Sequence, residues 1–199
     1  MSAIRPVVYV LDDDEIILWM FKEVLQSIGV ECRAYQSAQA FLADYRPHPC
    51  ECLVSDLRMP EIGGLEVQRQ LLAKETTLPI IFVSGYAEIS SAVEALKQGA
   101  FDFLEKPVNG ALLVDKVQAA LARSRELHAQ RVQAAAREAR LALLTDKERA
   151  VCARVVAGES SKEIAATMQL SIRTVENHRA RIMEKLHAGS TVELVKLFL

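Results

Sequence analysis

The sequence predicts an α/β fold, a doubly wound parallel sheet of five strands, which a long helix joins to a small all-α domain of four helices. Three observations carry this prediction. Over the first 108 residues, short apolar runs alternate five times with helical patterns, as is typical of a doubly wound sheet. Residues 122–144 contain no glycine or proline and consist mostly of strong helix formers. The remaining residues then show helical periodicity that is divided by turns.

Composition and charge indicate a folded chain with two unlike halves. Hydrophobic residues make up 51% of the 199 residues, which is ample for a packed core and excludes a disordered chain. The net charge is −2, but residues 1–122 carry 10 basic and 17 acidic side chains, a net −7, whereas residues 123–199 carry 14 and 9, a net +5. Such a split favours two domains with different partners, and the basic half favours nucleic acid.

The cysteines and the chain start bear on the compartment. Cys32, Cys50, Cys52 and Cys152 are irregularly spaced and lack His or Cys partners at zinc-site spacing, so they are interpreted as reduced thiols. The N-terminus shows no secretion signal, and no apolar run approaches the roughly 18 residues of a membrane helix. We therefore expect a soluble, cytoplasmic protein with no membrane partner.

The five predicted strands are short apolar runs. The continuous apolar character of the first run is expected of a strand that is covered on both faces of a parallel sheet. The strands are placed at residues 7–11, 30–35, 52–55, 79–83 and 101–104. The connections between such parallel strands are right-handed crossovers.

Helical patterns fill the segments between the strands. From Asp14, apolar residues recur at spacings of three and four until Gly29, a usual place for a left-handed helix end. Ser37 is positioned to cap a helix that runs through Tyr45. Further helices are predicted over 65–74, with Leu65, Leu71 and Leu72 facing inward, over 89–98, and from 109 onward.

Charged or hydroxyl side chains stand at the ends of four predicted strands. Asp12 and Asp13 follow the first strand, Asp56 follows the third, Ser84 ends the fourth, and Lys106 comes just after the fifth. The carboxyl ends of parallel strands meet at one edge of a sheet, where ligands bind. If the strands are neighbours, these side chains converge at one point.

Such a point has a definite chemistry. Three carboxylates that lie close together stay ionised only with a cation, and oxygen ligands with open positions suit Mg²⁺. Mg²⁺ and a lysine beside a carboxylate form an arrangement for phosphoryl transfer to that carboxylate. Taken singly, each residue is more simply explained as a solvated loop charge or a helix cap. The coincidence of four strand ends favours the phosphoryl-transfer site.

The motifs of residues 5–122 are the Asp pair after the first strand, Asp56 followed by Met59-Pro60 and Gly63-Gly64, Ser84, and Lys106-Pro107. With these motifs the segment resembles the receiver domain of bacterial two-component response regulators, which has a flavodoxin-like fold. The resemblance implies that a sensor histidine kinase phosphorylates Asp56, and that the bond before Pro107 is cis. The Mg²⁺ ligands that it implies are Asp13, Asp56, the backbone carbonyl of Arg58 and, through water, Asp12.

The resemblance also implies a conformational switch. In receivers, a hydroxyl residue at the end of the fourth strand and an aromatic residue three positions before the lysine respond to phosphorylation, and here these are Ser84 and Phe103. For Phe103, an ordinary core role stays open as the alternative. Arg58 and Tyr86 stand at positions that tune dephosphorylation in the family.

Residues 123–143 are predicted to form a helical linker rather than a flexible tether, and whether this helix dimerises stays open.

Residues 144–199 begin with a capping box, Thr145-Asp146-Lys147-Glu148, and Gly158 ends the first helix. Further helices are predicted at 161–168, from 171 to about 186, and at 191–199. Two helices with a tight turn, the second of them basic, indicate a helix-turn-helix, although a small bundle with a solvated basic face also fits.

This last segment contains the motif residues Leu144–Glu148, Gly158, Lys162-Glu163-Ile164-Ala165, Arg173–Glu176, His178-Arg179 and Lys185-Leu186. In these residues it resembles the DNA-binding domain of NarL/FixJ (LuxR-type) regulators. Base contacts are predicted by position for Thr174, Glu176, Asn177 and Arg181. Phosphate contacts are predicted for Lys162, Arg173, Arg179 and Lys185. His178 is interpreted as a packing or phosphate residue rather than a metal ligand, and Glu176 alternatively pairs with Arg179.

Together these features predict a DNA-binding response regulator rather than an enzyme. Phosphorylation of Asp56 is expected to control dimerisation and promoter binding. The expected partners are a sensor histidine kinase, promoter DNA, RNA polymerase and a second copy of the chain. Two rival interpretations are a metal-dependent phosphatase or phosphotransferase that uses Asp56 as its nucleophile, and a DNA-binding protein whose receiver is controlled by a protein partner without phosphate.

Overall fold

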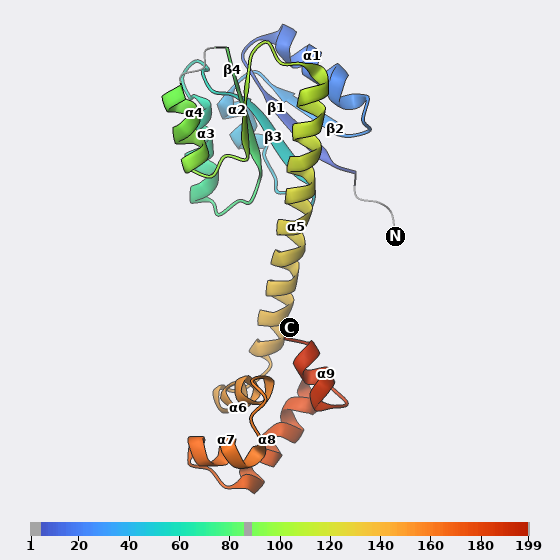
Figure 1. The fold of residues 1–199 in the computed structure, drawn as a ribbon, viewed down its shortest axis with the longest axis vertical. Coiled ribbons are helices and arrows are strands. Elements are labelled where there is room, and N and C mark those ends of the chain that lie inside the picture. The colour runs from blue at the N-terminus through green and yellow to red at the C-terminus, as the bar shows by residue number, and fades with distance from the viewer. Residues whose placement is uncertain (1–4, 86–88, 199) are drawn as a thin grey trace. The chain divides into compact units, whose positions relative to one another are not determined.

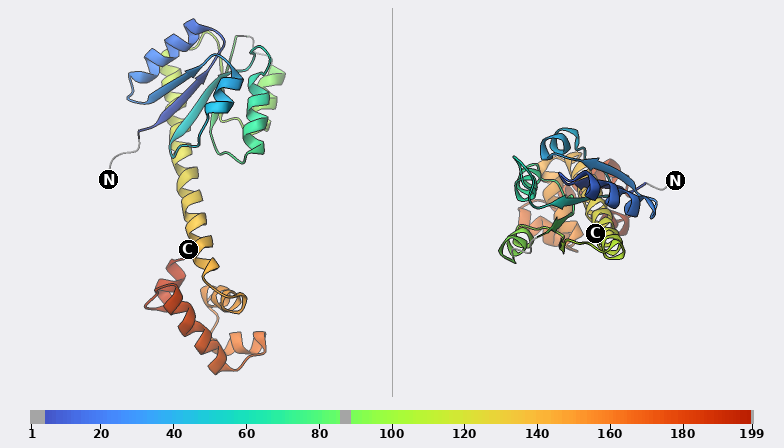
Figure 2. Two further views of the ribbon diagram at one scale, coloured as in Figure 1. Left: turned by 180° about the vertical axis from the view of Figure 1, so that it is seen from behind. Right: turned by 90° about the horizontal axis from the view of Figure 1, so that it is seen from above.

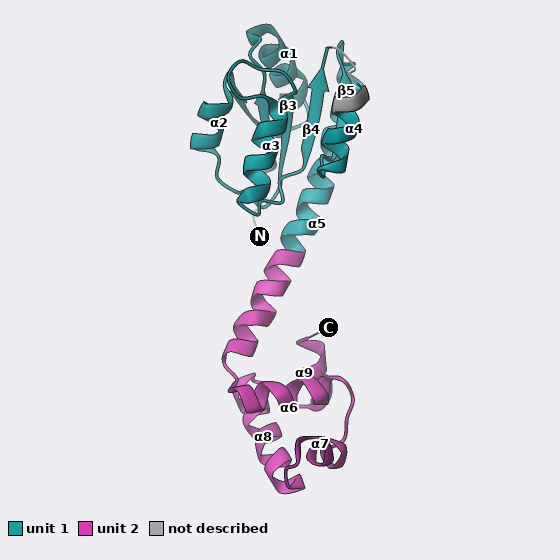
Figure 3. Cartoon of the chain, turned by 90° about the vertical axis from the view of Figure 1, so that its left-hand side faces the viewer, with its two compact units in different colours: residues 1–129 teal, residues 130–199 magenta. Residues whose placement is uncertain are grey.

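The structure, a computed structural model, describes residues 5–85 and 89–198. The chain divides into two compact units, residues 1–129 and residues 130–199 (Figure 3). The boundary lies inside one long helix and within the segment that the sequence predicts as a linker. Each unit has its own apolar core.

The first unit is built on a five-stranded parallel sheet in the order β2-β1-β3-β4-β5 (Figure 1). The predicted strand number and direction are confirmed, and each strand end either matches the predicted one or differs from it by one residue. The strands are β1 (Val7–Leu11), β2 (Glu31–Tyr35), β3 (Glu51–Asp56), β4 (Ile80–Ser84) and β5 (Asp102–Glu105).

Helices cover both faces of this sheet, as the two views of Figure 2 show. Side chains of α1 and α5 pack with one face of the sheet, and side chains of α2, α3 and α4 pack with the other. Every residue of β1 and β4 is therefore buried. The helices of this unit are α1 (Glu15–Gln26), α2 (Ala38–Asp44), α3 (Gly64–Ala73), α4 (Ile89–Lys97) and the first part of α5 (Gly110–Ala142).

Local chemistry explains where these helices begin and which side they bury. Asp14 is the N-cap of α1, and its carboxylate accepts a hydrogen bond from the backbone N–H of Ile16 at 2.8 Å. In α3 the prediction for Leu72 was wrong, because 50% of its surface is exposed whereas Leu71 is buried. The buried side of α3 holds Gly64, Val67, Gln68 and Leu71. Leu72 is turned by about 100° from Leu71 and away from Val67, so it lies beyond the edge of this side.

The predicted helical linker is confirmed as the C-terminal part of α5, a continuous helix of 33 residues. Where α5 leaves the sheet, the buried hydroxyl of Ser124 accepts a hydrogen bond from the backbone N–H of Glu51 at 2.9 Å. This contact ties the helix to the start of β3, the strand that ends at Asp56.

The second unit holds four short helices, α6 (Asp146–Val156), α7 (Ser161–Met168), α8 (Ile172–Lys185) and α9 (Thr191–Lys196). The predicted capping box of Thr145 and Glu148 is present, and Ser160 and Glu163 form a second one. The core of this unit includes four side chains with 0% of their surface exposed, namely Val151, Ile164, Val175 and Ile182. The last helix ends three residues before the predicted position.

Candidate functional site

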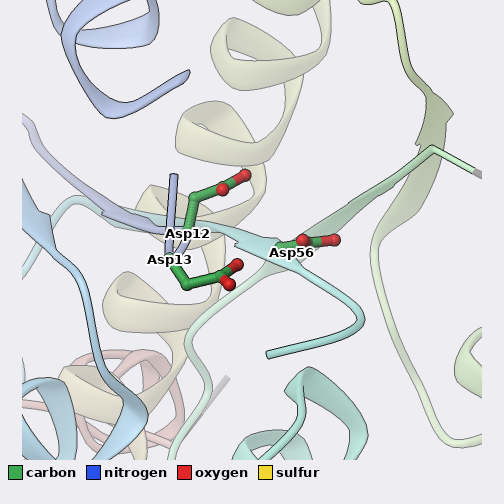
Figure 4. A group of neighbouring side chains, drawn as sticks. All are labelled: Asp12, Asp13 and Asp56. Carbon is green, nitrogen blue, oxygen red and sulfur yellow. The ribbon is translucent and has the colours of Figure 1, made fainter. Parts of the chain in front are cut away.

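Three carboxylates converge at the carboxyl edge of the sheet (Figure 4). Leu11 pairs with Ser55 in the register of β1 and β3, so the residues that follow these two strands are neighbours. Asp12, Asp13 and Asp56 each offer a carboxylate oxygen, and these oxygens all lie within 4.8 Å of one another. Asp12 is buried, Asp56 is partly buried and Asp13 is exposed. The convergence that the sequence predicts is therefore present.

Lys106 brings a positive charge into the same pocket. Its Nζ lies 2.6 Å from Oδ2 of Asp12 and 3.3 Å from Oδ2 of Asp56. The other oxygen of Asp12, Oδ1, accepts a hydrogen bond from the backbone N–H of Asp14 at 3.0 Å. The buried carboxylate of Asp12 thus has a partner on both oxygens, which is what a buried charge requires.

Burial and pairing act against each other on the protonation of this cluster. Burial raises the pKa of the Asp12 carboxyl, and the hydrogen bond from Lys106 opposes that rise. For Lys106, burial lowers the pKa, but the hydrogen bond to Asp12 and the attraction of both carboxylates outweigh it, so the pKa is raised overall. Lys106 therefore carries its charge at neutral pH.

A tight turn holds Asp56 in place. The backbone N–H of Gly64 donates to the carbonyl of Leu57 at 3.0 Å. A Cβ at position 64 would lie 2.4 Å from the backbone oxygen of Asp56 and 2.8 Å from Cε1 of Phe82. The backbone N–H of Arg58 points back at Oδ1 of Asp56, at 3.4 Å. Gly64 matched a family motif in the sequence, but only the structure shows that its missing side chain makes room for the Asp56 backbone.

Two further residues predicted for this site lie on the neighbouring strands β4 and β5. Ser84 is 2% exposed at the end of β4, and its carbonyl accepts a hydrogen bond from the backbone N–H of Lys106 at 2.8 Å. Phe103 is partly buried and packs against the core formed with α2, α3 and α4. The bond between Lys106 and Pro107 is cis, which confirms the prediction. Tyr86 lies outside the described residues.

The donor set of the pocket fits a hard divalent cation. Asp12, Asp13 and Asp56 offer carboxylate oxygens only, with no thiolate or imidazole among them. Oxygen ligands from one or two carboxylates, with further positions left for water or phosphate, are typical of Mg²⁺ sites.

A second candidate site is the exposed face of α8. Four of the residues predicted to bind DNA on this helix are exposed, namely Arg173, Glu176, Asn177 and Arg181, and Lys162 of α7 is exposed as well. Thr174 is partly buried, and its backbone N–H donates to the N-cap hydroxyl of Ser171 at 3.0 Å. His178 is also partly buried, and its Nδ1 has no hydrogen-bond partner within the described part of the chain.

Two basic residues of α8 make contacts inside the unit. Nζ of Lys185 lies 2.6 Å from Oε2 of Glu148, whose side chain is buried at 3% exposure. The hydrogen bond from Lys185, followed by those from Thr145, lowers the pKa of Glu148 to about 2. Arg179 donates to the hydroxyl of Thr191 at 3.1 Å. This geometry favours a structural role for Lys185, and sequence reasoning missed it because the two partners lie 37 residues apart.

Both units match known families. Residues 8–118 match the response regulator receiver domain, and residues 142–198 match the bacterial regulatory proteins of the luxR family. The chain therefore belongs to the two-component response regulators that carry a LuxR-type DNA-binding domain, and this places it among transcriptional regulators rather than in a catalytic family. No helix within residues 5–85 and 89–198 combines the length and the apolar character that a membrane span needs.

Several relatives match this chain over nearly its whole length. The response regulator protein TodT of Pseudomonas putida is 36% identical over 197 residues, which cover 99% of this chain and 87% of TodT. The transcriptional regulatory protein FixJ of Azorhizobium caulinodans is 39% identical over 192 residues, which cover 96% of this chain and 91% of FixJ. Among solved structures, the response regulator StyR is 34% identical with a TM-score of 0.83, and the match covers 98% of both chains.

Proposed function

We propose that Asp56 is the phosphoacceptor of this response regulator and that its phosphorylation controls dimerisation and promoter binding. The observation that carries the proposal is the pocket in which Asp56 lies beside two further carboxylates and 3.3 Å from the Lys106 ammonium. We assign residues 5–122 to the receiver, 123–143 to the helical linker and 144–199 to the DNA-binding domain. We place the protein in the cytoplasm, with promoter DNA and RNA polymerase as its partners.

The residues of the pocket supply most of what phosphoryl transfer requires. A carboxylate oxygen of Asp56 forms the new P–O bond while the P–N bond to a kinase histidine breaks, and the electron pair of that bond leaves with the imidazole. Lys106 and the hydroxyl of Ser84 then hold phosphoryl oxygens. Asp13, Asp56 and the carbonyl of Arg58 would hold Mg²⁺, with Asp12 acting through water, and the bound ion would offset the charge of the phosphoryl group.

The two proposed switch residues lie on adjacent, paired strands of the receiver. Ser84 ends β4, and Phe103 lies on β5, where Phe82 of β4 pairs with it. We propose that Ser84 and Phe103 shift together when the phosphoryl group binds, which changes the surface of α4, β5 and α5 and favours a homodimer.

A face of α1 supports a protein partner at the pocket. Ile16, Trp19 and Met20 are 67%, 64% and 44% exposed, and their spacing of three and four places them on one side of the helix. The helix begins directly after Asp14, so this apolar face starts beside the acidic pocket. A kinase that presents its phosphohistidine to Asp56 would cover it.

The exposed face of α8 supports DNA binding by the second unit. Arg173, Arg181 and Lys162 are exposed cations that suit DNA phosphates. Thr174, Glu176, Asn177 and Arg181 lie on the helix that a helix-turn-helix inserts into the major groove. We retain Arg179 and His178 as phosphate contacts, whereas Lys185 reaches DNA only if it leaves Glu148.

The test is phosphorylation of the purified chain by a small phosphoryl donor with Mg²⁺, followed on a phosphate-affinity gel. Asp56→Asn should abolish the shifted band, and Asp115→Asn, which removes an exposed carboxylate of α5, should leave it unchanged. Promoter binding should rise on phosphorylation of the unmodified chain only. A shifted band in the Asp56→Asn variant would contradict the assignment, and turnover of small phosphoesters would favour a phosphatase instead.

A further inference from the structure

Ile172 is an exposed aliphatic side chain on a helix whose exposed face is otherwise mostly polar. It is the first residue of α8, and 47% of its surface is accessible. The buried stripe of that helix consists of Val175 and Ile182, and Ile172 takes no part in the core of the second unit. Exposed polar residues follow it on the first two turns, at Arg173, Glu176 and Asn177.

The N-terminus of α8, which carries Ile172, is stabilised by a side-chain cap. Ser171 caps α8 by accepting a hydrogen bond from the backbone N–H of Thr174 at 3.0 Å, and the two hydroxyls lie 2.8 Å apart. An isoleucine in a helix has one strongly preferred rotamer about its first side-chain bond. The Cγ2 methyl group of Ile172 is therefore largely held in one place, so little conformational entropy is lost when it contacts a ligand.

We propose that Ile172 contacts the 5-methyl group of a thymine in the major groove and so sets one base preference of this regulator. The N-terminal residues of a recognition helix are those that reach base edges. The thymine methyl is the apolar group that the major groove presents to them, and aliphatic side chains are its partners. This inference rests on the proposed DNA-binding role of α8 and adds to it a residue that sequence reasoning did not select.

A solitary exposed aliphatic residue is common on protein surfaces. The position of Ile172 on the helix, rather than its exposure, is therefore what supports a contact with DNA. Val192 on α9 is 65% exposed in the same unit, but it belongs to a different helix from the predicted base contacts. Ile172 instead stands next to Arg173 and one turn before Glu176. Val192 is therefore the matched control for Ile172.

The experiment begins with the phosphorylated full-length chain and a binding site selected from random DNA. Each thymine of that site is replaced in turn by deoxyuridine, which removes only the 5-methyl group. We expect one position, or its symmetric pair, at which the unmodified protein loses about three- to fivefold in affinity, as the loss of one buried methyl group implies. In Ile172→Ala this loss should disappear, whereas Val192→Ala should retain it.

The outcomes separate this inference from the function on which it rests. Failure of the phosphorylated chain to select any sequence would overturn the proposed function. A selected site at which no deoxyuridine matters, or at which Ile172→Ala keeps the full loss, would overturn the role of Ile172 alone. Ile172→Val, which keeps the branch at Cβ and removes only the terminal Cδ1 methyl group, should preserve part of the discrimination. Circular dichroism should show the same helix content in all three variants, because the changed side chains are exposed.

Discussion

The ammonium of Lys106 lies 2.6 Å from the buried carboxylate of Asp12. The same ammonium is 3.3 Å from Asp56, so one lysine neutralises part of the charge of three neighbouring acids. A divalent cation that enters this pocket must share the carboxylates with Lys106. The strength of metal binding therefore depends on a side chain that is not itself a ligand.

Removal of the Lys106 charge should strengthen Mg²⁺ binding. In Lys106→Ala the repulsion between the ammonium and the metal is lost, and at the effective dielectric constant of a protein surface this is worth at least about 1.4 kcal/mol, or about tenfold in affinity. Isothermal titration calorimetry of the unphosphorylated chain measures it.

The control for this change is Lys116→Ala. That substitution removes an equal charge, paired with Asp102 at 2.6 Å outside the pocket, and should leave Mg²⁺ affinity nearly unchanged. Equal affinities in the unmodified chain and in Lys106→Ala would mean that the lysine does not compete with the metal.

Once phosphorylated, Lys106→Ala should also fail to shift to a dimer in light scattering, because Lys106 would no longer hold the phosphoryl group.

The contrast between Asp56 and Lys185 shows how far sequence reasoning reaches. Asp12, Asp56 and Lys106 were predictable as neighbours because each follows a strand, and parallel strands end at one edge. Lys185 follows no such rule. Its partner Glu148 was recognised only as a local capping residue, and their contact depends on how α6 and α8 pack, which no spacing along the chain encodes.

The same limit applies to Gly64 and Leu72. A Gly-Gly pair after Asp56 predicts a turn, but the close approach of the Asp56 carbonyl to position 64 is a tertiary fact. Leu72 has the apolar character of a core residue, and only the rotation of α3 against the sheet shows that Leu71 takes the inner position. Sequence patterns thus predict elements and shared edges more securely than individual contacts.

A methyl group at position 64 should damage the receiver. Gly64→Ala places a Cβ 2.4 Å from the Asp56 carbonyl oxygen, and backbone must shift to relieve the clash. We expect the receiver to lose about 1–3 kcal/mol of unfolding free energy, measured by urea denaturation, together with slower phosphorylation because Asp56 moves.

Gly110→Ala is the matched substitution for this test. A Cβ at position 110 would meet only Val24 side-chain atoms, the nearest at 3.5 Å, which is an ordinary contact distance. Alanine also favours the helix that starts there, so stability should be equal or slightly higher. Comparable losses in the two variants would show that the space around Gly64 is not limiting.

Acid should weaken the second unit through Glu148. Its pKa is about 2 in the folded chain against an ordinary value of 4.5, so between these values the folded unit binds fewer protons than the unfolded chain. Its contribution is therefore complete above about pH 4.5 and is lost as the pH falls towards 2. Urea titrations monitored by NMR through the core methyl groups of Ile164 and Ile182 measure this dependence.

Glu148→Gln should flatten that acid dependence. Some slope should persist, because hydrogen bonds from Ser160 also lower the pKa of Glu163. Glu184→Gln, an exposed change on the same helix as Lys185, serves as the control. If Glu148→Gln kept the full acid slope, the pair formed with Lys185 would not be what couples this unit to pH.

Substitution of Trp19 should affect phosphorylation by the kinase but not phosphorylation by a small phosphoryl donor. The side chain is 64% exposed on the apolar face of α1, the helix that directly follows Asp14 along the chain, and aromatic residues of this kind are enriched among the residues that dominate protein interfaces. Trp19→Ala should lower kcat/KM for phosphotransfer from the cognate kinase at least tenfold. Phosphorylation by a small donor should stay within about twofold, because Asp56, Lys106 and the metal ligands are untouched. Leu72→Ala, at a residue 50% exposed on α3, should alter neither rate. An equal fall in both rates for Trp19→Ala would place its effect inside the pocket, and no fall in either would remove this face of α1 from kinase recognition.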